Sequence, residues 1–210
     1  MASVNAPRGL VLARKNGQGS NSTGIDTISW FGADASILPS AALGSMYVGD
    51  PLIAGTSCTV LPAPADPSDK CIGVFQGISY VNVDGEQVFR RYWESGTSGT
   101  DIKIHISRDP NQTYFIQGDT SVVAVSGVGN PKPTNVPWIV GTGSKITGNS
   151  GYVFDSSGAA DAQRNLRVIR RAPWDTDTCT SAGVTDQYPW YEVILNNHYD
   201  RFQTTSVSTG

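Results

Sequence analysis

Short runs of β-branched and aromatic residues recur between turn-forming residues from residue 25 onward, and this pattern constrains the fold more than any other feature. It is typical of an antiparallel all-β protein, because such side chains favour strands whereas Gly and Pro interrupt them. Strands are predicted at residues 25–31, 46–48, 58–61, 72–81, 88–93, 102–107, 114–117, 121–125, 138–140, 152–154, 166–172 and 191–196. Strands in this number favour an antiparallel β-sandwich, jelly-roll-like or barrel body.

The run DIKIHI at residues 101–106 alternates polar and apolar side chains. Successive side chains of a strand point to opposite faces. Ile102, Ile104 and Ile106 are therefore expected on a buried face, with His105 among the polar residues on the other.

The dipeptide Asp84-Gly85 separates two predicted strands and predicts a tight hairpin, because both of its residues tolerate positive φ. The ribbon that it joins is rich in aromatic residues. We expect these to pack between strands and not to bind a ligand. They are Phe75, Tyr80, Phe89, Tyr92 and Trp93.

Composition argues against several classes of function. The formal net charge of −3 provides no basic surface for a phosphate backbone, so nucleic acid is not an expected partner. No apolar run is long enough for a membrane span, and the first residues lack the apolar core of a secretory signal, so neither a membrane nor export is expected.

The three cysteines, Cys58, Cys71 and Cys179, lack the spacing of a metal site. Cys58 and Cys71 are expected as buried thiols, with a disulfide bridge between them as the alternative.

No motif for catalysis is evident. The two histidines, His105 and His198, are isolated in the sequence, and no serine lies in a GxSxG elbow. Residues 175–177 (DTD) lack the downstream glycine and glutamate of a calcium loop, and the glycine-containing loops lack the ending of a phosphate-binding loop. We therefore predict no enzyme, no cofactor and no metal site.

Residues 1–23 differ from the rest of the chain in charge. They contain Arg8, Arg14, Lys15 and the α-amino group, but no acidic side chain and no sustained helical or strand period. Such a segment buries too little apolar area to order alone, so we expect an arm that orders on a partner, with a frayed terminus as the alternative. The expected organisation is an extended arm at residues 1–23, an all-β body at residues 24–203 and a tail at residues 204–210.

Several segments, in the same order along the chain, resemble the capsid decoration (cement) proteins of tailed bacteriophages. They are NAPRGL at residues 5–10, YVGDP at 47–51, IGVFQG at 72–77, SRDPN at 107–111 with YFIQ at 114–117, LRVI at 166–169 and VILNNH at 193–198.

The resemblance implies a structural protein that is made in the host cytoplasm and lies on the outer surface of the virion. Such a protein decorates and stabilises a phage head by bridging major capsid subunits, typically as a homotrimer, and catalyses no reaction. A β-tulip-like decoration fold is then an alternative to the larger sandwich. The arm would bind the major capsid protein through seven residues, among them two arginines and an apolar group. These are Asn5, Pro7, Arg8, Leu10, Val11, Leu12 and Arg14.

Two other functions are kept as alternatives. Trp138, Trp174 and Trp190 each follow a proline in a loop-like segment, which is also typical of a carbohydrate- or receptor-binding β-sandwich virion module. A jelly-roll glycan hydrolase would need two carboxylates brought together by the fold, and the sequence singles out no such pair.

Overall fold

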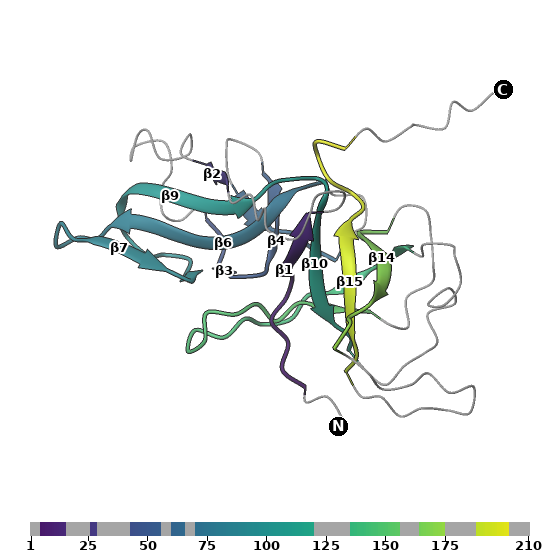
Figure 1. The fold of residues 1–210 in the computed structure, drawn as a ribbon. Coiled ribbons are helices and arrows are strands. Elements are labelled where there is room, and N and C mark those ends of the chain that lie inside the picture. Colours follow the sequence, from purple (N-terminus) through teal and green to yellow (C-terminus); the bar gives the residue numbers. More distant parts are fainter. Residues whose placement is uncertain are drawn as a thin grey trace, which may run out of the picture.

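The structure is a computed structural model that describes residues 5–15, 26–28, 43–55, 60–65, 70–119, 135–155, 164–174 and 188–201. Every secondary-structure element assigned within these ranges is a β-strand. The strands pair in antiparallel fashion within the sheets. The predicted all-β class is therefore confirmed. Figure 1 shows two sheets side by side, with the long strands of one running across the direction of the other.

The first sheet contains five strands in the order β1-β10-β15-β14-β11. Its strands are β1 (Val11–Lys15), β10 (Gln112–Gln117), β15 (Trp190–Leu195), β14 (Leu166–Arg171) and β11 (Asn135–Val136). Strand β1 lies at one end of this order, so one of its edges is an edge of the sheet.

The second sheet contains six strands in the order β2-β9-β6-β4-β5, with β7 also paired to β6. They are β2 (Asp26–Ile28), β9 (Thr100–Ser107), β6 (Cys71–Val81), β4 (Pro51–Ala54), β5 (Val60–Pro62) and β7 (Gln87–Arg90). The longest strand, β6, contributes Val74 to one buried cluster and Phe75 to the other. It therefore joins the two halves of a sandwich-like body.

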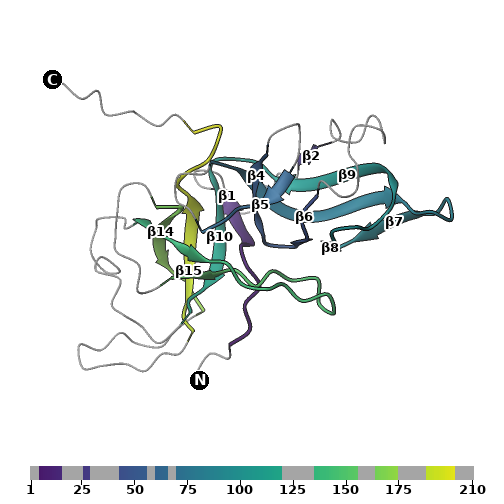
Figure 2. The same cartoon turned by 180° about the vertical axis from the view of Figure 1, so that it is seen from behind.

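Two short strand pairs complete the described part of the fold. Strands β3 (Met46–Tyr47) and β8 (Tyr92–Trp93) form one, and β12 (Trp138–Ile139) and β13 (Val153–Phe154) form the other. The long β12–β13 connection projects beneath the second sheet (Figure 2). It is tied to Val48, the residue after β3, because the Val48 amide donates to the Gly148 carbonyl and the Ser150 amide donates to the Val48 carbonyl.

Three of the observed strands were not predicted: β1, β4 and β11. Strand β4 begins with Pro51, a residue that usually interrupts strands, and β11 spans only two residues. The run predicted at residues 88–93 divides into β7 and β8 at Arg91. Most other predicted strands overlap an observed one, with ends that coincide or differ by up to three residues.

The predicted alternation along β9 is confirmed. Ile102, Ile104 and Ile106 are 4%, 0% and 0% exposed and belong to the second cluster. His105 lies on the opposite face, where its Nε2 is 3.2 Å from the hydroxyl of Ser79. Alternation of period two therefore identified the buried face of this strand correctly.

The hairpin predicted at Asp84-Gly85 is present, but the prediction of a tight turn formed by these two residues is wrong. Val81 pairs with Gln87, which leaves five residues in the connection, and of the predicted dipeptide Gly85 alone has positive φ. The side-chain oxygen of Asn82 accepts hydrogen bonds from the amides of Asp84 and Glu86. This local bonding by an asparagine stabilises a wider turn.

Four of the aromatic residues of the ribbon divide into two groups. Phe75, Tyr80 and Trp93 are buried, and the rings of Tyr80 and Trp93 meet edge to face at 5.2 Å. Phe89 is 62% exposed and lies against the ring of His105. The prediction of packing between strands is confirmed for the three buried rings.

Some predicted features lie outside the described residues. They are the strand at 121–125, the segment 175–177, Cys58, Cys179, the tail at residues 204–210, and residues 1–4 and 16–23 of the predicted arm. Cys71 lies at the start of β6 and is 1% exposed, so burial is confirmed for this thiol.

Candidate protein-binding surface

Part of the predicted arm is a strand of the body. Val11 pairs with Phe115 and Leu12 with Tyr114, so residues 11–15 extend the first sheet (Figure 1). Leu10 is 1% exposed and packs in the first cluster. Pairing with β10 and burial of Leu10 supply the stabilisation that this segment lacks alone, and for that reason it differs from a free arm.

Two glycines let the N-terminal segment lie directly against the body. Gly9 has φ 64° and Gly49 has φ 100°. A Cβ on Gly49 would overlap the carbonyl oxygen of Arg8, and a Cβ on Gly9 would overlap the side chain of Ser150. The Leu10 amide donates to the Gly49 carbonyl at 2.9 Å. The glycines therefore hold residues 8–10 at backbone contact distance from the body.

The structure separates the predicted partner-binding residues into three groups. Asn5 and Arg8 are exposed and Val11 is 38% exposed, so these side chains are available to a partner. Pro7 and Leu12 are partly buried, and Leu12 packs against the first cluster. Leu10 lies in the protein's own core, which corrects its predicted role as an anchor for a partner; the side chain of Arg14 lies outside the described part.

A groove of about 400 Å³ lies beside the N-terminal segment. Four of the predicted contact residues line it: Arg8, Leu10, Val11 and Leu12. Five further residues of its lining were not predicted from the sequence as contacts: Val48, Gln76, Arg91, Thr147 and Asn149. Figure 2 shows β1, in purple, next to the β12–β13 connection, in green, which supplies Thr147 and Asn149. Val48 lies in the YVGDP segment and Gln76 in the IGVFQG segment. The resemblance of these two segments to decoration proteins was therefore the sequence signal that pointed to this region.

The segments that carry the resemblance meet where the two sheets join. The NAPRGL and YVGDP segments touch at Gly9 and Gly49. The YVGDP segment bonds to the IGVFQG segment, because the Gly49 amide donates to the Phe75 carbonyl and the Phe75 amide donates to the Asp50 carbonyl, each at 2.9 Å. Ser107, the first residue of SRDPN, pairs with Val74 of the same IGVFQG segment.

The VILNNH segment joins this region at the start of β6. The Cys71 amide donates to the Asn197 carbonyl, and the Tyr199 amide donates to the Cys71 carbonyl, each at 2.8 Å. The fold therefore brings together pieces of chain that are up to nearly two hundred residues apart in sequence.

Asp50 is the buried acid of this junction. It is 3% exposed, and its Oδ2 accepts the Tyr47 amide at 2.8 Å. Burial raises the pKa of its carboxyl from 3.8 to about 6, although hydrogen bonds from Ser150 and Tyr47 oppose this shift. The folded protein thus binds a proton at Asp50 over a pH range in which the unfolded chain has released it.

Replacing Asp50 with asparagine should change how stability depends on pH. Because the pKa is raised in the folded state, the stabilisation is fully present below pH 4 and decreases as pH rises through about 6. One pKa unit corresponds to about 1.4 kcal/mol, so the free energy of unfolding of Asp50→Asn should gain about 3 kcal/mol relative to the wild type between pH 4 and pH 7. Urea denaturation at several pH values measures this, and parallel curves for the two proteins would contradict it.

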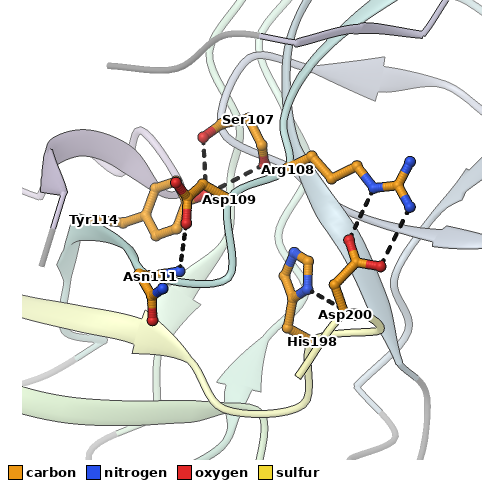
Figure 3. A network of polar contacts seen from close by, with 7 residues as sticks. All are labelled: Ser107, Arg108, Asp109, Asn111, Tyr114, His198 and Asp200. Atoms are coloured by element: carbon orange, nitrogen blue, oxygen red, sulfur yellow. Dashed lines mark hydrogen bonds and ion pairs between the residues drawn. The ribbon is translucent and has the colours of Figure 1, made fainter. Parts of the chain in front are cut away.

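A second polar network lies where the chain leaves β9 and where it leaves β15 (Figure 3). Arg108 donates through Nε and Nη2 to the two carboxylate oxygens of Asp200, at 2.9 and 3.3 Å. The Asp200 amide donates to Nδ1 of His198, a residue that is 1% exposed. The Tyr114 hydroxyl lies 3.1 Å from the hydroxyl of Ser107. The network therefore fixes the β9–β10 connection to the segment after β15.

This network contains a serine, a histidine and an aspartate, but they are not arranged as a hydrolase triad. In a triad, a carboxylate accepts a hydrogen bond from the Nδ1–H group of the histidine, so that Nε2 acts as the base. Here Nδ1 of His198 accepts a hydrogen bond, and the carboxylate of Asp200 binds Arg108. Nε2 of His198 then bears the proton, and burial lowers the pKa of the ring. These contacts indicate a structural role.

The three proline-linked tryptophans differ in exposure. Trp138 is 2% exposed and donates its indole N–H to the Pro64 carbonyl, so it closes a loop. Trp190 is partly buried in β15. Trp174 is 57% exposed, and Phe115 packs against its ring. A set of exposed rings for stacking sugars is therefore not found among these three residues.

Among the described residues, no group of three His, Cys, Asp or Glu could hold a metal ion. Within the same ranges, no helix is long and apolar enough to span a membrane. No family model, curated protein or solved structure matches the chain.

Proposed function

We propose that this chain is a structural protein that decorates a phage head from its outer surface and stabilises it by bridging major capsid subunits, as a homotrimer. No reaction, cofactor or metal forms part of the proposal. Its partners are the major capsid protein and further copies of the chain itself.

The single observation that carries the proposal is the convergence of the segments that resemble decoration proteins. Taken separately these segments are short, and short strings recur by chance. In the fold, the NAPRGL, YVGDP, IGVFQG and SRDPN segments are bonded to one another where the two sheets join, and the VILNNH segment is bonded to Cys71, the residue before IGVFQG. Shared contacts explain why such segments would occur together in one family of folds.

The N-terminal segment supports the binding part of the proposal. Asn5, Arg8 and Val11 remain accessible, while Leu10 fixes the same stretch of chain to the core. A fixed segment loses less conformational freedom on binding than a mobile one, so each exposed contact contributes more to affinity. Three such segments in a trimer would add avidity of roughly two to four orders of magnitude.

Binding to undecorated heads of the virus that encodes the chain tests the proposal. We expect saturable binding of the wild-type protein, and we expect the Arg8→Glu variant to lose about tenfold or more in affinity, because Arg8 is exposed and its charge would be reversed. Arg90→Glu is the matched control: it makes the same charge change at an exposed arginine that does not line the groove. Absence of wild-type binding, or equal losses for both variants, would contradict the proposal.

A further inference from the structure

We propose that the groove beside β1 binds an acidic peptide segment, whose carboxylate is held by Arg8, Arg91 and Gln76. This inference deepens the proposed function and rests on it, since the segment would belong to the capsid protein. The partner is thus assigned by chemistry: an extended piece of protein that carries carboxylates next to apolar side chains.

A β-bulge directs Gln76 toward the groove. On β6, Phe75 pairs with Ile106 and Gly77 pairs with His105, so Gln76 is an extra residue opposite β9. The bulge also explains why Phe75 and Ile78, three residues apart, both belong to the second cluster. Bulges of this kind change the direction of a side chain, and they are common beside binding sites.

The amide of Gln76 has an unused donor at this position. Its Nε2 is buried and has no hydrogen-bond partner among the described residues. A buried donor without a partner is costly, and such cases are rare in folded proteins. A rotation of this side chain would bring the amide to the groove that Gln76 lines, where a carboxylate oxygen would accept its hydrogen bond.

Two arginines border the same groove, and none of the lining residues is acidic. Arg8 is exposed and has no ion-pair partner within the described ranges. Arg91 donates one hydrogen bond from Nη2 to the side chain of Asn149, at 2.9 Å, which orients its guanidinium and leaves other N–H donors. Guanidinium groups bind carboxylates strongly, through paired hydrogen bonds.

The apolar lining of the groove distinguishes a peptide from other anions. Val11, Leu12 and Val48 supply an apolar side, which suits the side chains of a peptide and offers nothing to a free phosphate. The net charge of −3 disfavours a nucleic-acid backbone. The volume of about 400 Å³ lies within the range of pockets that hold small ligands.

Calorimetric titration of the full chain with a hexapeptide of alternating glutamate and valine tests the inference. At low salt, we expect the peptide to bind, and Arg91→Ala and Gln76→Leu each to weaken binding about tenfold, because each removes a side chain that donates hydrogen bonds to the carboxylate. A peptide of alternating glutamine and valine should not bind. Arg90→Ala is the matched control and should stay within about twofold, since Arg90 lies over the rings of Tyr80 and Tyr92 and not in the groove.

Three results would overturn the inference. They are equal affinity for the two peptides, unchanged affinity in the Arg91 and Gln76 variants, and tighter binding of inorganic phosphate than of the acidic peptide. Binding to heads separates this inference from the proposed function. Full occupancy by Arg91→Ala would refute the groove as the capsid contact and leave decoration intact, whereas no binding by the wild type would refute decoration itself.

Discussion

Replacing Leu10 with alanine is expected to lower the free energy of unfolding by about 2–5 kcal/mol, which is the usual cost of truncating a fully buried leucine. Leu10 is 1% exposed and packs in the first cluster, although it lies in a segment whose composition suggests a free arm. The loss should appear as a lower midpoint in urea with an unchanged slope, because the same surface is still buried on folding.

Val11→Ala is the matched control for this variant. Val11 is the next residue, also aliphatic, and is 38% exposed. Its truncation should cost only about 0.5–1 kcal/mol, since an exposed position on an edge strand buries little area. Equal losses in the two variants would contradict the assignment of Leu10 to the core.

Replacing Gly49 with alanine is expected to cost more than about 3 kcal/mol. Its φ of 100° is costly for any residue with a Cβ, at about 1–3 kcal/mol. The added Cβ would also overlap the carbonyl oxygen of Arg8, so residues 8–10 would have to move away from the body. Thermal unfolding measures the loss, and faster trypsin cleavage after Arg8 would report the displaced segment.

Gly85→Ala is the control that separates the cost of backbone strain from the cost of steric overlap. Gly85 has φ 82°, but a Cβ there would have no neighbour within 4 Å. Its substitution should therefore cost only the backbone strain, about 1–2 kcal/mol. If Gly49→Ala costs no more than Gly85→Ala, the close approach of the N-terminal segment to Gly49 is not what requires a glycine there.

Deletion of the N-terminal segment is a poor test of its role in binding. Deleting residues 1–20 would remove β1 and Leu10, and would expose the edge of β10. Loss of head binding by such a deletion would mix unfolding with lost contacts. Substitutions at Arg8 and Arg91 avoid this problem, because both side chains are exposed.

The sequence predicted features that depend on neighbours along the chain. The buried isoleucines of β9 follow from alternation, and the position of the β6–β7 hairpin follows from Gly85. The five-residue turn was not predictable from Asp84-Gly85, because it depends on the hydrogen bonds of Asn82. Local pattern therefore located elements better than it defined their connections.

Long-range pairing was harder to predict. Because of the charges of Arg8, Arg14 and Lys15, the sequence did not predict strand β1. This strand forms because it pairs with β10. Gln76 belongs to a strand that was predicted correctly, but the bulge that directs it to the groove depends on its register with β9. Arg91 gave no signal at all, because only the fold places it beside residues of the N-terminal segment.

An electron cryomicroscopy reconstruction of the head, after the chain is added to undecorated particles, tests the central claim most directly. Decoration predicts three copies of the chain at local threefold positions on the outer surface, with residues 5–12 and the groove facing the capsid protein. A saturating excess of the chain that leaves the outer surface of the head without added density would contradict it.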